Sequence, residues 1–155
     1  MANSAGMCTS FKGELLTGIH ALGPGTGVPA RTVSTADVVK AALFLASASR
    51  GVADTVYNTT GELAASGNYT QGGVTVTMAT APSTSGTTGI FTPSASFTWA
   101  ALTSSGAFDA CVLYNSSQSN KQISVHTFSS QSITAGTFTL TMPTNDASNA
   151  LLRIA

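Results

Sequence analysis

"AFDACVLYNSSQSNKQISVHTFSSQSITAGTFTLTMP", from Ala107 to Pro143, contains three segments of β pattern separated by polar turns. Residues 108–114 are almost all apolar, which predicts a central strand that is covered on both faces. Residues 121–128 and 136–142 instead alternate in period two, which predicts half-buried strands. The proline ends the last of these strands because it cannot donate to a ladder. The stretch therefore predicts several antiparallel strands close together in sequence.

The same two-residue period continues upstream of this stretch. "GVTVTM" (73–78) places Val74, Val76 and Met78 on one face, and "SFTWA" (96–100) does the same for Phe97 and Trp99. Gly-, Ser- and Asn-rich turns separate these segments, and several short strands at such spacing are typical of sandwiches and jelly rolls. We therefore expect an all-β fold, an antiparallel β-sandwich of jelly-roll type, over residues 33–155.

Residues 1–32 differ in sequence pattern from the rest of the chain. We expect them to form an N-terminal arm or first strand followed by a linker. In "SFKGELLTGIHAL" (10–22), Phe11, Leu15 and Ile19 recur at helical spacing, but the segment also fits an extended chain. We favour the extended interpretation. The glycines and prolines of "GPGTGVPA" (23–30) then predict a loop.

The segment "STADVVKAALFLASASRG" (34–51) also fits two structures. Ser34 and Asp37 have the spacing of a helix capping box, and the Ala and Leu residues that follow favour a helix. A strand buried on both faces fits equally well. The residues alone favour the helix slightly.

Charge is scarce and balanced in this chain. Charged residues make up 8% of the sequence and the formal net charge is zero, whereas about a quarter of residues are charged in typical proteins. No Asp, Glu, Lys or Arg occurs between Leu63 and Phe108. The sequence thus lacks the basic face that nucleic acids or anionic membranes require, and we expect neither as a partner.

The sequence shows no pattern typical of enzymes, and we expect no catalytic site, cofactor or metal. His126 lies on a strand face, and a hydrogen-bonded structural histidine is favoured over a catalytic one. The six carboxylates are scattered singly, and no metal-binding spacing occurs. Asp109 interrupts the apolar strand and is expected at its end, at an interface or paired.

The sequence also gives expectations for the two cysteines and for both terminal segments. Cys8 and Cys111 are expected as free thiols of a reducing cytoplasm rather than as a disulfide. The N-terminal residues lack a basic region followed by an apolar one, which predicts no secretory signal. The tail "ALLRIA" (150–155) is expected to form a last short strand in its own core, or to pack onto a neighbouring molecule.

The stretch 107–143 resembles a family of small virion proteins of tailed bacteriophages. It shares an apolar strand ending in Tyr-Asn, an Asn-Lys hairpin and a Gly-Thr-Phe-Thr-Leu strand ending in proline. "TTGELAASGNYTQGGVTV" (59–76) and "SFKGELLTGIHAL" (10–22) are similar to further features of that family. The resemblance implies a jelly-roll sandwich, and it implies that "KAALFLASAS" (40–49) is a strand.

The resemblance also implies a function. It points to a capsid cement or decoration protein, made in the bacterial host cytoplasm, that binds the outer surface of the phage head and stabilises capsomer joints. Its partners would be the major capsid protein and further copies of itself, as a homodimer or homotrimer. The residues expected to make these contacts are Phe11, Leu15, Leu16 and Ile19 in the N-terminal patch, and Leu151, Leu152 and Ile154 in the tail.

Two other functions remain open from the sequence. A tail or fibre protein would keep the virion location at a lower copy number. A carbohydrate-binding module would need an exposed aromatic platform around Trp99 or Tyr69.

Overall fold

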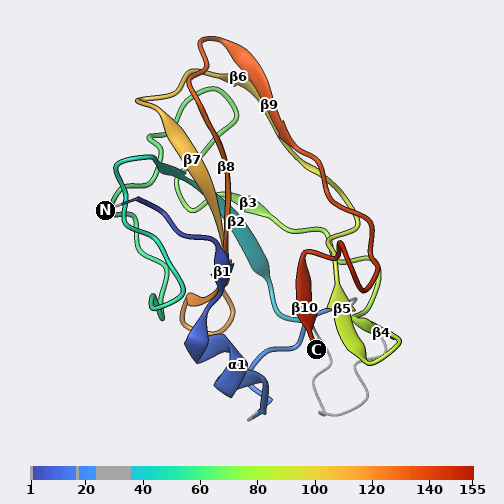
Figure 1. Ribbon diagram of the computed structural model, residues 1–155. Helices are drawn as coiled ribbons and strands as arrows, with labels where there is room; N and C mark the ends of the chain where they lie inside the picture. Colours follow the sequence, from blue (N-terminus) through green and yellow to red (C-terminus); the bar gives the residue numbers. More distant parts are fainter. Residues whose placement is uncertain (1, 17, 24–35) are drawn as a thin grey trace.

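The computed structural model describes residues 2–16, 18–23 and 36–155. These residues form an all-β, antiparallel fold with one short helix among the described segments (Figure 1). The elements in chain order are β1 (Gly6–Met7), α1 (Thr9–Leu16), β2 (Val39–Leu45), β3 (Val74–Thr75), β4 (Ser83–Ser85), β5 (Thr88–Phe91), β6 (Phe97–Leu102), β7 (Phe108–Asn115), β8 (Lys121–Gln131), β9 (Gly136–Leu140) and β10 (Leu152–Ile154).

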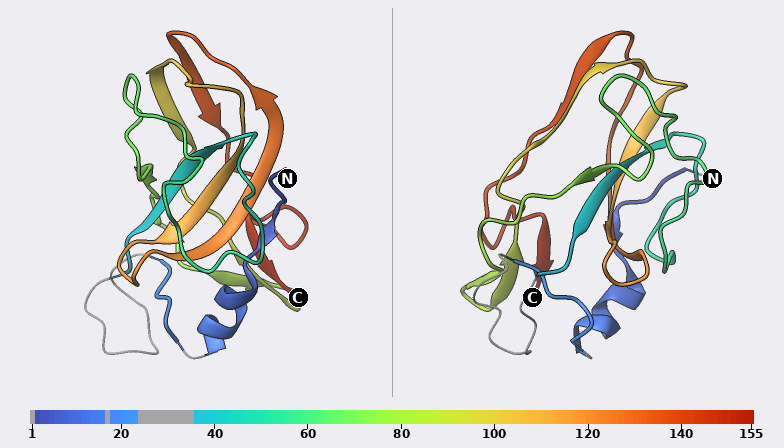
Figure 2. Two further views of the ribbon diagram at one scale, coloured as in Figure 1. Left: turned by 90° about the vertical axis from the view of Figure 1, so that its left-hand side faces the viewer. Right: turned by 180° about the vertical axis from the view of Figure 1, so that it is seen from behind.

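The strands form two layers, as an antiparallel β-sandwich does. One layer is a five-stranded sheet with the order β1-β8-β7-β2-β3. The pair β6-β9 and the three-stranded sheet β10-β5-β4 form the opposite layer (Figure 2). The all-β sandwich expected from the sequence is confirmed, while the jelly-roll connectivity stays a prediction.

Strand β7 lies at the centre of the larger sheet and is buried on both faces, as its apolar sequence predicted. Cys111 and Leu113 point into the main core between the layers. Val112 and Tyr114 belong to a second cluster on the outer face, where they pack with Tyr57. The chain that follows β2 therefore covers the outer face of the sheet.

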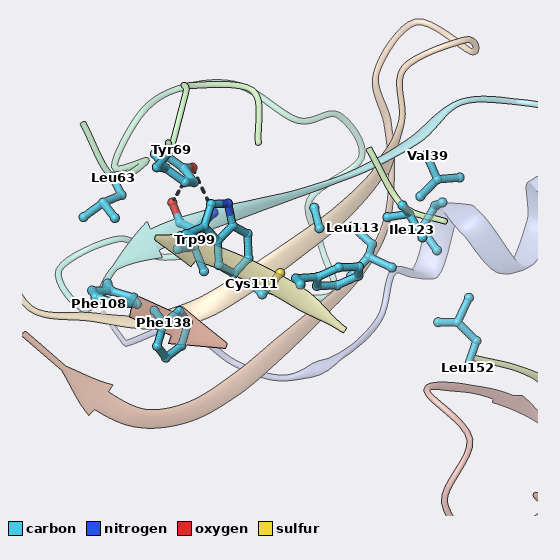
Figure 3. Packing of buried hydrophobic residues seen from close by; sticks show 14 of the residues in the cluster. Val39, Leu63, Tyr69, Trp99, Phe108, Cys111, Leu113, Ile123, Phe138 and Leu152 are labelled. Atoms are coloured by element: carbon cyan, nitrogen blue, oxygen red, sulfur yellow. Dashed lines mark hydrogen bonds between the residues drawn. The ribbon is translucent and has the colours of Figure 1, made fainter. Parts of the chain in front are cut away.

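Aromatic rings fill the centre of the main core (Figure 3). The rings of Trp99 and Phe138 stack with their centroids 5.9 Å apart, and Phe108 meets Phe138 edge-on at 5.0 Å. Such offset and edge-to-face contacts add to the free energy of burial. The inward positions predicted for Phe97, Trp99 and Phe138 on β6 and β9 are confirmed.

The slight preference for a helix over residues 34–51 was wrong for the described part of that segment. Val39–Leu45 form strand β2, which pairs antiparallel with β7 with Ala42 opposite Val112. The strand implied by the family resemblance is therefore confirmed at this position. Helix propensity is a weak term, and burial of both faces of "VKAALFL" against two core clusters outweighs it.

The extended interpretation of "SFKGELLTGIHAL" was also wrong. Thr9–Leu16 form helix α1, and Phe11 on it is 1% exposed. The helical spacing of Phe11 and Leu15 was the correct signal, because both side chains pack against the main core. Within the described N-terminal residues, Gly6–Met7 form strand β1, which pairs with β8. The expected linker and the boundary at residue 32 fall within 24–35, outside the described residues.

Strand β8 departs from the simple alternation that its sequence predicts. The register with β7 shifts between Leu113 and Tyr114. As a result Ile123 belongs to the main core while Val125 packs in the outer cluster, although the two are separated by one residue. A bulge of this kind moves later side chains to the other face, and it places His126 opposite Cys111 on the inner side.

The segment 59–73 is held close to the sheets at two glycines. Gly73 has a φ of +72°, and a Cβ atom there would lie 2.0 Å from the carbonyl oxygen of Ala41 on β2. Gly67 has a φ of +58°, and its Cβ would lie 2.1 Å from the carbonyl oxygen of Ala101 on β6. The glycines at 67 and 73 are thus required by the close packing of this segment.

We predict that Gly73→Ala lowers the free energy of unfolding by about 3 kcal/mol or more, because strain and a backbone clash add. Gly86 is the matched control. It also has a left-handed φ, +59°, but its Cβ would meet nothing within 4 Å. Gly86→Ala should therefore cost only about 1 kcal/mol. Urea unfolding of both variants measures the difference, and equal losses would contradict the close packing of the segment.

Candidate functional site

Helix α1 and strand β1, from the first part of the described chain, lie beside strand β10 from its last part (Figure 1). The tail forms strand β10, which pairs antiparallel with β5 and so adds to its own fold, with Leu152 buried. The other edge of β10 faces α1 and β1 in both Figure 1 and Figure 2. No strand among the described residues pairs with that edge.

Between α1 and β10 lie two hollows of about 240 and 320 Å³. Met7, Leu15 and Ile154 line both of them, so the two hollows are adjacent and are described together. We call this pair of hollows the α1–β10 cleft. Its lining is mostly apolar and consists of Met7, Phe11, Lys12, Leu15, Leu16, His20, Ala21, Leu22, Pro82, Ser83, Gly89, Ile90, Phe91, Leu152, Arg153, Ile154 and Ala155.

The structure brings most of the predicted contact residues to this cleft. Phe11 and Leu152 are buried and form its floor, and Leu15 lines its wall. Leu16 is 91% exposed and Ile154 is 51% exposed, so these two side chains project at the rim.

Two of the predicted contact residues lie elsewhere. Leu151 lines separate hollows beside His126. Ile19 is partly buried and lines none of the hollows described for this structure.

Two cations at the cleft were missed by sequence reasoning. Lys12 on α1 and Arg153 on β10 both line it and are exposed. Arg153 Nη1 donates to the carbonyl oxygen of Ser148, which holds the guanidinium group against the tail turn. A signal was present in the sequence, since both cations sit between apolar residues of the two predicted contact segments.

A network of polar side chains fixes α1 in place. Glu14 on α1 accepts from Lys121 Nζ at 2.5 Å and lies 2.7 Å from His20 Nε2. The other ring nitrogen of His20 is 2.9 Å from Asn115 Nδ2, which also donates to Asp37 at 2.8 Å. Burial would raise the pKa of Glu14, but the hydrogen bonds from Lys121 and His20 outweigh it and lower that pKa. The helix is therefore tied to the β7–β8 turn.

A second buried network contains all three tyrosines of the chain. Glu62 accepts hydrogen bonds from Tyr57 at 2.5 Å, from Tyr69 at 2.7 Å and from the Gly72 amide at 2.7 Å. Tyr114 stacks on Tyr57 with centroids 4.0 Å apart and donates to the Gly72 carbonyl oxygen. Glu62, Tyr69 and Gly72 belong to the segment 59–73, so this segment supplies much of the network.

The tyrosines of this network are poorly suited to proton transfer. Burial, together with the neighbouring Glu62 carboxylate, raises the pKa of Tyr114 to about 12 and those of Tyr57 and Tyr69 further. They therefore remain protonated hydrogen-bond donors at neutral pH. The network has a structural role, because it holds the segment 59–73 in place beside β2.

We predict that Glu62→Gln lowers the free energy of unfolding by about 2 kcal/mol, because an amide nitrogen would face groups that already donate. Tyr57→Phe removes one donor and leaves the carboxylate two others, so its loss should be smaller, about 1 kcal/mol. Urea denaturation measures both. A Glu62→Gln protein as stable as the wild type would show that the carboxylate is not what holds the network together.

His126 has no catalytic partner in the described part of the chain. Its Nε2 lies 2.9 Å from Ser124 Oγ, and no carboxylate among the described residues is hydrogen-bonded to this pair. Burial lowers the pKa of His126 to about 4, so the ring is neutral at physiological pH. The expected structural, hydrogen-bonded histidine matches this geometry.

Because the pKa of His126 is about 4 in the folded protein and 6.5 in its ordinary state, the unfolded chain binds a proton first as pH falls. Stability due to this residue is therefore complete above about pH 6.5 and is lost toward pH 4. We predict that the wild type loses more stability between pH 7.5 and 5.5 than His126→Gln does, as measured by urea unfolding. Parallel losses would contradict a neutral buried ring.

Other kinds of site find little support in the described residues. Within 2–16, 18–23 and 36–155, no three His, Cys, Asp or Glu side chains gather as metal ligands would. Cys8 and Cys111 are free and buried, and burial raises the pKa of both thiols, that of Cys111 to about 12. Asp109 is paired with the Asn3 amide at 2.6 Å. The helix in the described region is too short and too polar to cross a bilayer.

Comparison with known proteins found no matching family model, no matching curated protein and no matching solved structure. The function is therefore argued from the residues and the geometry of this chain.

Proposed function

We propose that this protein is a structural component of a bacteriophage virion, a capsid cement or decoration protein that binds the outer surface of the head and stabilises the joints between capsomers. The observation that carries the proposal is the α1–β10 cleft, where apolar side chains project from a well-packed sandwich. Both chain segments that resemblance and patterning marked as contact regions contribute to it.

The rim of the cleft has the properties of a surface that is covered in an assembly. Leu16 is 91% exposed and Ile154 is 51% exposed, side by side with the half-buried Leu15. Exposed single apolar residues are ordinary, but a group of them beside a hollow is typical of protein contact sites. A shell subunit that covered this rim would bury it and gain free energy.

The remainder of the molecule suits a passive structural role. Its buried carboxylate and tyrosines hold the chain together, and its one partly buried histidine on β8 is neutral. A homodimer or homotrimer would repeat the same cleft on each protomer. Bridging two capsid subunits through linked copies strengthens binding through effective concentration, without any single strong contact.

Of the alternatives, the carbohydrate-binding module is disfavoured by burial. Trp99 and Tyr69 are each 1% exposed, so neither offers a platform to a sugar ring. A tail or fibre protein would use the same fold and the same cleft, and copy number distinguishes it from a cement protein.

The proposal is tested by binding to purified, expanded capsid shells that lack this protein. Saturation at hundreds of copies per shell, together with a raised melting temperature of the shell, is the expected result. A few copies bound at one vertex, or no binding, would overturn the cement proposal and favour the tail or fibre alternative.

We predict that Leu16→Ser weakens shell binding by about ten- to a hundredfold, since burying one leucine contributes about 1.5–3 kcal/mol. Its own melting temperature should not change, because the side chain is 91% exposed. Val56, 45% exposed and outside the cleft, is the matched control. If Val56→Ser weakens binding as much as Leu16→Ser, the contact does not lie at the cleft.

A further inference from the structure

The carboxylates of this chain are already engaged within its own fold. Each of the six accepts at least one hydrogen bond from the described residues. Their partners are Lys121 and His20 for Glu14, Asn115 for Asp37, the Gly51 amide for Asp54, two tyrosines for Glu62, Asn3 for Asp109, and Thr144 and Asn149 for Asp146.

The cations of the α1–β10 cleft are in the opposite situation. Lys12 and Arg153 are exposed and form no ion pair with any described residue. No Asp or Glu side chain lines either hollow of the cleft. An apolar hollow is therefore flanked by two positive charges that form no ion pair with the described residues.

The shape of the cleft favours an extended protein segment over a small ligand. Leu16 and Ile154 project at its rim, where a molecule inside the hollow would leave them in water. The edge of β10 beside the cleft has no strand partner among the described residues. Extended peptides commonly add to such edges and place alternate side chains into neighbouring pockets.

We propose that the α1–β10 cleft binds an extended segment of another protein in which apolar side chains are flanked by Asp or Glu. The apolar side chains pack against Leu15, Leu16 and Ile154, and the carboxylates lie against Lys12 and Arg153. This inference rests on the proposed function for the identity of the partner, which is then a surface segment of the shell protein.

Charge also argues against two other occupants. A second copy of this chain offers no Asp or Glu side chain that lacks a hydrogen-bond partner in its own fold, and so none that is free for these cations. A nucleic acid or an anionic membrane calls for a cluster of four or more cations, and the cleft has two.

The first test uses Lys12→Glu in the shell-binding experiment. Lys12 is exposed in the first turn of α1, where an acidic residue is tolerated or favoured, so folding should be unaffected. We expect binding at least tenfold weaker. Lys12→Arg, which keeps the charge, and Lys40→Glu, on β2 and outside the cleft, should each stay within twofold of the wild type.

The dependence of shell binding on salt concentration is a second test of the same contact. Raising NaCl from 50 to 500 mM should weaken wild-type binding several-fold, because screening shortens the range of charge interactions. The Lys12→Glu protein should lose this dependence. If Lys12→Glu binds as the wild type does while Leu16→Ser binds weakly, the cleft contact is purely apolar and the charge proposal is overturned, although the cement proposal stands.

A probe independent of the shell separates the two proposals. The ¹⁵N-labelled protein is titrated with the peptides acetyl-Asp-Val-Leu-Val-Glu-amide and acetyl-Lys-Val-Leu-Val-Lys-amide. Shifts of the amide signals of Lys12, Leu16 and Ile154 with the acidic peptide alone support the inference, even if shells do not bind. No shifts with either peptide, or equal shifts with both, overturn it.

Discussion

Strand β7 has no face turned to water, and the architecture follows from that constraint. Its inner side chains require the layer formed by β6, β9, β5 and β10, and its outer side chains require a cover from residues 46–60. Because burial of apolar surface is the main driving force of folding, neither cover is optional. The glycines at 67 and 73 hold the segment 59–73 close to strands β6 and β2, and Glu62 links that segment to Tyr57 in the cover.

The sequence identified the central strand and the inward residues of β6 and β9 because burial imposes a period that can be read directly. It was less informative where two forces compete. "VKAALFL" has good helix formers, and only the partner strands on either side of it make β2 the better structure. Helix α1 was visible in the spacing of Phe11 and Leu15, but the glycine within it and its short length obscured the signal.

Two features could not be read from the residues at all. The bulge that sends Ile123 and Val125 to different clusters depends on how β7 and β8 align, which no local pattern specifies. The convergence of α1 and β10 depends on the whole chain path. The seven predicted contact residues are apolar residues of two distant segments, and in the structure Leu16 and Ile154 share a rim whereas Ile19 and Leu151 line neither hollow of the cleft. The same chain path brings Lys12 and Arg153 to one hollow, which their positions in the sequence do not indicate.

The cleft is assembled from segments that lie more than a hundred residues apart, α1 at Thr9–Leu16 and β10 at Leu152–Ile154. Neither segment can form its wall until the sandwich between them has closed, because β10 is held by β5 and α1 by the β7–β8 turn. Contacts of such long sequence separation carry a loop-closure entropy cost that the packed sandwich must offset. A partner that recognises this cleft therefore binds only copies in which α1 and β10 are both held by a folded sandwich. Truncated or misfolded copies are excluded from any assembly built through the cleft.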